Sequence, residues 1–144
     1  HSWIELSMVS PFNLAIACPE GFLPDQNLTE KARAAGLSDI EIFHNPFDAV
    51  KNADVIYTDV WASMGQKEEA EERRRKFKSF QVNKKLMDHT GKDTYFMHCL
   101  PAERGIEVTD EVCDSELSII FDEAENRMHA QNAIMLKMME ESNS

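Results

Sequence analysis

The sequence predicts an α/β fold in one domain: a doubly wound, mainly parallel sheet with helices on both faces. Short apolar runs alternate with helix-like segments along the chain, which is the order of strand–helix–strand units. The runs are almost continuously apolar, as expected of parallel strands that are covered on both faces. A length of 144 residues, with 42% hydrophobic and 28% charged residues, suits a single domain with a sizeable core.

Each element follows from its own pattern. A helix-like apolar spacing over 1–10 opens the chain without a capping residue ahead of it, so we expect the chain to be a fragment. The expected strands lie at 13–18, 39–44, 54–59, 94–99 and 117–122. The expected helices lie at 27–36, 46–53, 67–80 and 83–91. A last helix is expected to begin at about Glu123, because Asp122 and Glu125 form a capping pattern.

Charge and missing motifs disfavour several classes of function. The net charge is −11, and no basic stripe is available to bind the phosphates of a nucleic acid. The sequence has no glycine-rich phosphate loop and no cluster with metal-ligand spacing, so we expect no cofactor and no metal. No apolar run approaches the length of a membrane span. Three cysteines at unrelated spacings indicate free thiols in a reducing compartment: Cys18, Cys99 and Cys113.

Cys99 ends one of the expected strands. Ligands of such sheets bind beyond the carboxyl ends of the strands, where a nearby cation would lower the pKa of a thiol and make it a ligand or a proton acceptor. The alternative is a small buried core residue, which is common for a free cysteine. His98 is the adjacent residue on the same strand, so the two side chains should point to opposite faces. A Cys–His nucleophile–base couple is therefore disfavoured.

Asp59 closes the strand expected at 54–59. Its carboxylate could cap the following turn or bind an amino group, and by itself the pattern favours the cap. The next residues, 61–65, combine Trp and Met with a glycine, which suits a lid over a crevice. Simple packing of this loop against the helix expected at 67–80 is the alternative.

Arg127 is expected on the packed face of the last helix. At about 100° per residue it shares that face with Ala130, Ile134 and Met138, and we expect the methionine-rich remainder of the helix to be core. Burying an arginine is costly unless it is paired. Its partner is either a core carboxylate or an anionic or carbonyl ligand held near the helix N-terminus, and the second interpretation is slightly favoured.

Three segments together resemble the ornithine carbamoyltransferases: "DVWASMG", "HCLP" and "AENRMH", in that order. "HSW" at the start and "ACPEGF" after the first expected strand fit as well. The resemblance covers the whole chain but only the second half of such an enzyme. It implies two α/β domains with catalysis in the cleft between them. Residues 1–144 would form the ornithine-binding domain, and the carbamoyl-phosphate-binding domain would be absent.

The resemblance also assigns roles to residues of this sequence. Asp59 would hold the α-amino group of ornithine, with Ser63 and Met64 beside it. Cys99 would lie by the reacting δ-amine as proton acceptor or electrostatic partner. Leu100 would offer its carbonyl to the carbamoyl group, whose own carbonyl Arg127 would polarise.

The implied reaction is carbamoyl transfer from carbamoyl phosphate to ornithine, giving citrulline and phosphate, as in arginine biosynthesis or a urea cycle. No cofactor is implied. The complete enzyme would be a homotrimer built mainly through the other domain, so this chain is not expected to assemble by itself. The family's phosphate-binding Ser-x-Arg-Thr segment does not occur in the chain, and neither does the Asn pair expected before His1. We expect a cytoplasmic protein, or one of an organelle matrix if a targeting segment precedes His1.

Other functions remain open. A non-catalytic domain that binds an amino acid would not need Cys99 or Arg127. A carbamoyltransferase for a related amine, such as putrescine or an acylated ornithine, would share most of the motifs. An aspartate-type enzyme should have Pro-Leu-Pro where this chain has "HCLP". A thiol-dependent hydrolase is weakened by the placement of His98 beside Cys99.

Overall fold

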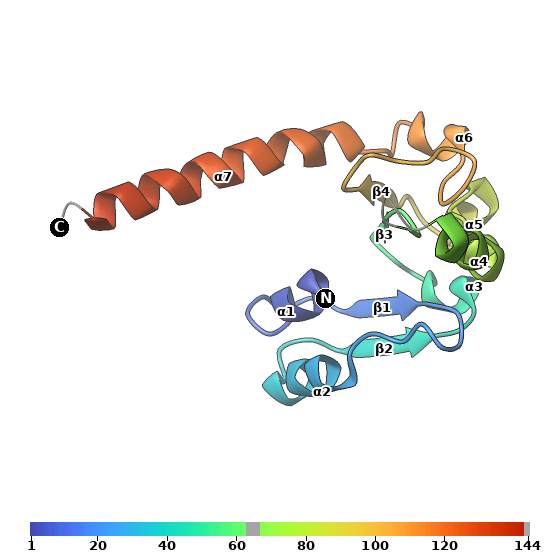
Figure 1. Ribbon diagram of the computed structural model, residues 1–144, viewed down its shortest axis with the longest axis horizontal. Helices are drawn as coiled ribbons and strands as arrows, with labels where there is room; N and C mark the ends of the chain where they lie inside the picture. The colour runs from blue at the N-terminus through green and yellow to red at the C-terminus, as the bar shows by residue number, and fades with distance from the viewer. Residues whose placement is uncertain (63–66, 143–144) are drawn as a thin grey trace.

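The computed structural model describes residues 1–62 and 67–142, and its elements alternate between helix and strand as expected (Figure 1). In chain order they are α1 (Ser2–Leu6), β1 (Leu14–Ala17), α2 (Gln26–Ala35), β2 (Ile40–Phe43), α3 (Pro46–Ala49), β3 (Val55–Thr58), α4 (Lys67–Phe77), the 3₁₀ helix η1 (Lys78–Phe80), α5 (Lys84–Asp88), β4 (Tyr95–His98), α6 (Asp110–Cys113) and α7 (Ile120–Ser142). The expected helices are therefore present, several of them shorter than their patterns. The short helix α6 was not expected.

The strands form two parallel pairs. In the first, β1 pairs with β2 from Leu14↔Ile40 to Ala17↔Phe43. In the second, β3 pairs with β4 from Val55↔Tyr95 to Thr58↔His98. The α/β class and the parallel strands are confirmed. Within the described residues the two pairs are separate two-stranded sheets rather than one continuous sheet.

The prediction of a strand at 117–122 is wrong. Only one bridge forms there, between Phe96 and Ser118. In this bridge the Phe96 amide donates to the Leu117 carbonyl and the Ile119 amide donates to the Phe96 carbonyl, both at 2.9 Å. The chain then turns directly into α7, because the Glu123 amide donates to the Ile119 carbonyl at 2.9 Å and starts the helical ladder. The helix thus begins at Ile120, ahead of the expected start at Glu123.

The main hydrophobic core lies on the β3–β4 half of the chain. Phe96, which is fully buried, sits among side chains of α5, α6 and the start of α7, including Leu86, Val112 and Ile120. A smaller cluster around Ile4, Ala32 and Ile40 joins α1 and α2 to β2. The larger core is thus built around the strand pair that leads to Asp59 and Cys99.

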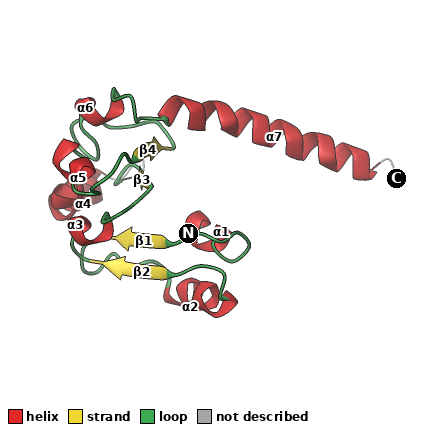
Figure 2. Ribbon diagram, turned by 180° about the vertical axis from the view of Figure 1, so that it is seen from behind, coloured by secondary structure: helices red, strands yellow, loops and turns green. Residues whose placement is uncertain are grey.

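The expectation that the last helix packs on the core is also wrong, because helix α7 extends away from the rest of the chain (Figures 1 and 2). Ile120 is its buried residue, and from Ala124 to Ser142 every side chain is exposed. Ile134 is 60% exposed and Met138 is 65% exposed, so the methionine-rich segment is not core. Arg127 is exposed as well. An apolar helix face is buried only where another surface covers it, and the described residues supply none along this length.

None of the helices within the described ranges is both long and apolar enough to cross a bilayer.

Candidate functional site

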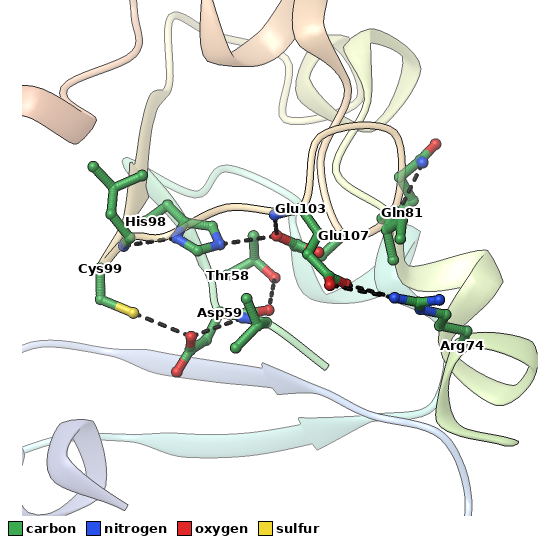
Figure 3. A network of polar contacts seen from close by, with 11 residues as sticks. Thr58, Asp59, Arg74, Gln81, His98, Cys99, Glu103 and Glu107 are labelled. Carbon is green, nitrogen blue, oxygen red and sulfur yellow. Dashed lines mark hydrogen bonds and ion pairs between the residues drawn. The ribbon is translucent and has the colours of Figure 1, made fainter. Parts of the chain in front are cut away.

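Asp59 and Cys99 come together at the carboxyl ends of β3 and β4. The last residues of the two strands, Thr58 and His98, are partners in the parallel register. The residues that follow them must therefore meet at the same edge. The Cys99 thiol donates to Asp59 Oδ1 at 3.1 Å (Figure 3). The strand-end placement that the sequence predicts for these two residues is confirmed.

Asp59 also caps its own turn. The Val60 amide donates to the same Oδ1 atom at 2.7 Å, which fixes the direction of the carboxylate. The side chain is nevertheless exposed. Capping and ligand binding are therefore compatible here, because the cap occupies one oxygen of an exposed carboxylate.

The surroundings of Cys99 favour a neutral thiol. Burial is the largest effect and raises the pKa of Cys99, and the hydrogen bond and charge of Asp59 raise that pKa further. A hydrogen bond from Tyr57 acts in the opposite direction. Burial likewise raises the pKa of Tyr57, with its hydrogen bond to Cys99 as the next cause. The cation that would lower the thiol pKa is not among these causes, so in this chain Cys99 is a hydrogen-bond donor to Asp59.

His98 points away from Cys99 and into the protein (Figure 3). The Leu100 amide donates to His98 Nδ1 at 2.9 Å, so we place the ring proton on Nε2. Nε2 lies 3.3 Å from Oε1 of Glu107, and both side chains are fully buried. This contact has the length of an ion pair without the geometry of a hydrogen bond. The prediction that His98 and Cys99 do not form a nucleophile–base couple agrees with this arrangement.

Sequence reasoning missed two carboxylates near the site. Glu107 follows His98 in a loop without periodicity, and no sequence pattern pairs the two residues. Glu123 stands in the first turn of α7, partly buried, and its Oε2 makes no hydrogen bond within the described residues. Burial raises the pKa of Glu123, a hydrogen bond from the His98 backbone lowers it, and the charge of Asp59 raises it. The capping pattern drew attention to this stretch, but it indicated only a helix start.

A cavity of about 580 Å³ brings three of the predicted site residues together. Cys99, Leu100 and Arg127 all line it, together with Arg104 and the buried Cys113. Arg127 reaches this cavity from α7 although its helix face is otherwise uncovered. Arg104 is held by Asp110 and Asp114, so Arg127 is the guanidinium of this lining that is suited to an anionic or carbonyl ligand.

Two site predictions fall outside what the structure describes: Ser63 and Met64. The loop residue Trp61, just ahead of them, packs on Phe77 of α4, with ring centroids 5.8 Å apart. Within residues 1–62 and 67–142, no group of three potential metal-ligating side chains comes together.

Comparison with known proteins agrees with this geometry. Residues 1–138 match the family described as aspartate/ornithine carbamoyltransferase, Asp/Orn binding domain. The chloroplastic ornithine carbamoyltransferase of Pisum sativum is 63% identical over 139 residues, which are 96% of this chain and 37% of that protein.

Solved structures show the same fold. An anabolic ornithine carbamoyltransferase from Campylobacter jejuni superposes with a TM-score of 0.89 at 32% identity, covering 97% of this chain and 47% of that one. The enzyme from Pyrococcus furiosus gives a TM-score of 0.77 at 43% identity, covering 92% of this chain and 51% of that one. The chain therefore spans about half or less of the length of these proteins.

Proposed function

Since the chain belongs to the aspartate/ornithine carbamoyltransferase family, we propose that it forms the ornithine-binding half of an enzyme that carbamoylates L-ornithine. Residues 1–144 are this domain, and carbamoyl phosphate binds to an amino-terminal half outside the chain. The observation that carries the proposal is the meeting of Asp59 and Cys99 at one sheet edge, with Cys99, Leu100 and Arg127 around one cavity. The products are L-citrulline and phosphate, and no cofactor takes part.

Ornithine binds through its amino groups. Asp59 holds the α-ammonium, because it is an exposed carboxylate whose direction is fixed by the Val60 amide. The family resemblance assigns Ser63 and Met64, which lie outside the described residues, to the same end of the substrate. The δ-amine lies beside Cys99 and must lose a proton before its lone pair can attack. The sulfur of the neutral thiol accepts a hydrogen bond from the δ-ammonium while its own S–H donates to Asp59, so the proton lost from the amine can pass to sulfur as the thiol proton passes to Asp59.

The carbamoyl group is held on the other side of the Cys99–Leu100 turn. The δ-nitrogen forms a bond to the carbamoyl carbon, the bond from that carbon to the phosphate oxygen breaks, and phosphate leaves with the electron pair. Arg127 balances the negative charge that develops on the carbamoyl oxygen, while the Leu100 carbonyl accepts from the carbamoyl amide. Both groups line the cavity, which supports this assignment.

The missing half also completes the structure. The exposed apolar side chains of α7, such as Ile134, Leu136 and Met138, are candidates to pack against it. The complete enzyme is proposed to be a homotrimer that serves arginine biosynthesis, in the cytoplasm or in an organelle matrix. The name of the pea relative places that protein in the chloroplast, which is compatible with the second location.

The test is citrulline formation from ornithine and carbamoyl phosphate. We expect no activity from the 144-residue chain alone and activity when the amino-terminal half of the pea enzyme is added. Full activity of the chain alone would refute the placement of the phosphate site. If the reconstituted enzyme prefers putrescine or an acylated ornithine, that amine is the substrate in place of ornithine. Binding of ornithine without turnover would favour a non-catalytic domain.

A further inference from the structure

A continuous chain of polar contacts leads from α4 to the turn that carries Cys99 and Leu100 (Figure 3). Arg74 of α4 donates through Nη2 to both carboxylate oxygens of Glu103, at 3.1 and 3.2 Å. The Glu103 amide donates to Oε1 of Glu107, and that oxygen lies 3.3 Å from His98 Nε2. The other ring nitrogen of His98 accepts the Leu100 amide at 2.9 Å. Four residues, with the Glu103 main chain as one step, thus connect a helix surface to one backbone amide.

Stability alone does not account for the centre of this chain of contacts. His98 and Glu107 are both fully buried, and His98 Nε2 and Glu107 Oε2 have no hydrogen bond within the described residues. A buried pair of this kind is often no more stable than apolar side chains of the same volume. Apolar side chains could not accept the Leu100 amide. What the pair supplies is a ring nitrogen held in a fixed direction.

Leu100 needs such an anchor. Its φ of 53° lies in the left-handed region, which a leucine rarely adopts. Backbone of this kind persists where the surroundings over-determine it. The His98 ring fixes the Leu100 amide, and with it the peptide plane between Cys99 and Leu100, from which the Cys99 side chain and the Leu100 carbonyl extend.

We propose that Arg74, Glu103, Glu107 and His98 form a positioning relay that holds the Cys99–Leu100 turn and makes its geometry depend on helix α4. The relay deepens the proposed function and rests on it, since the turn carries two of the groups assigned to the substrates. Its residues act through the turn. Helix α4 also contacts the segment that follows Asp59, because Arg73 donates through Nη1 to the Trp61 carbonyl at 3.4 Å.

The first test measures the turn directly in the 144-residue chain. The readouts are hydrogen exchange of the Leu100 amide and iodoacetamide alkylation of Cys99, the remaining thiols being buried. Glu107→Gln keeps the side-chain shape and an oxygen acceptor but removes the charge that faces the Glu103 amide and the His98 ring. It should accelerate exchange at least about tenfold, the effect of weakening a hydrogen bond to a charged group. Arg74→Gln should accelerate exchange about threefold, the effect of a partly exposed ion pair.

Lys76→Gln is the matched control for Arg74. Lys76 lies on the same helix and forms a similar ion pair, but its partner is Glu72 of α4 rather than the loop. It should leave both rates unchanged. Equal effects of the Arg74 and Lys76 variants would mean that α4 is merely loosened, and the relay would be refuted.

A double-mutant cycle tests the connection itself. In the Glu107→Gln background, Arg74→Gln should add nothing, because the path is already broken. A full additional threefold effect would show that the two residues act independently and would overturn the proposal. If Glu107→Gln unfolds the chain, the same cycle with Arg74→Gln and Glu103→Gln decides, since both side chains are partly exposed.

The kinetic test uses the chain reconstituted with the amino-terminal half of the pea enzyme. Glu107→Gln should lower kcat about tenfold and leave KM for ornithine within about twofold, as expected for lost positioning of reacting groups. An unchanged kcat would refute a role in turnover. Exchange and alkylation need no activity, so a reconstituted enzyme that makes no citrulline would refute the proposed function while the cycle still decides the relay.

Discussion

Replacing Asp59 by asparagine isolates the charge of the proposed ammonium site. Asparagine keeps a side-chain oxygen that can accept the Val60 amide, now donated to Asp59 at 2.7 Å, and the Cys99 thiol. The turn after β3 is therefore retained, and the melting temperature should change little. Only the negative charge that faces solvent is lost.

The size of the effect follows from the exposure of the carboxylate. A hydrogen bond to a charged group contributes about 1.5–3 kcal/mol, and each 1.4 kcal/mol is a factor of about ten in affinity. Asp59 is exposed, so solvent screening places the loss at the lower end of this range. We expect ornithine affinity to fall about ten- to thirtyfold.

The assay is ornithine and carbamoyl phosphate affinity in the reconstituted enzyme. Carbamoyl phosphate affinity should stay within about twofold, because its proposed site lies across the Cys99–Leu100 turn. Asp54→Asn is the control: Asp54 stands at the other end of β3, is 91% exposed and pairs with Lys92. Equal losses for both substrates, or ornithine affinity that does not change, would reduce Asp59 to a turn cap.

Three further outcomes are expected. Cys99→Ser in the reconstituted enzyme should lower turnover at least about tenfold, or 1.4 kcal/mol of barrier, and unchanged kinetics would remove the thiol from the mechanism. Because burial and Asp59 raise the pKa of Cys99, its alkylation should begin at higher pH than that of a free cysteine, whose pKa is about 8.5. Asp59→Asn should move that pH profile downward, and a profile at or below the free-cysteine value would contradict the neutral thiol. Phe96→Ala should lower the free energy of unfolding in urea by about 3–5 kcal/mol, because Phe96 is fully buried. The control Tyr95→Ala removes a half-exposed ring from the same strand; equal losses for the two would mean that the core is not centred on Phe96.

Much of the site was predictable because parallel strands impose a simple rule. Apolar runs locate the strands, and parallel strands bring their carboxyl ends to one edge, so Asp59 and Cys99 were both expected at the ligand-binding edge. Their contact follows from the direct pairing of β3 with β4, which the structure shows. The opposite directions of His98 and Cys99 follow from the alternation of side chains along a strand. These inferences need only local periodicity and the handful of topologies open to an α/β chain.

The rest depended on contacts between residues far apart in the chain. Helix periodicity identified the apolar face of α7, but it does not indicate whether another surface covers that face. Arg127 was therefore predicted on a packed face, whereas the described residues leave this part of the helix exposed. The pairing of His98 with Glu107 joins a strand end to an irregular loop. The sequence of that loop has no periodicity from which the contact could be predicted.

The sequence by itself determined the α/β class, the strands that carry Asp59 and Cys99, and the family to which the chain is similar. These features follow from patterns within a few residues of one another. The tertiary structure alone decided that the Cys99 thiol is a donor to Asp59, that Leu100 is anchored on His98, and that α7 stands uncovered. Each of these depends on burial and on partners brought together through space, which local sequence patterns do not encode.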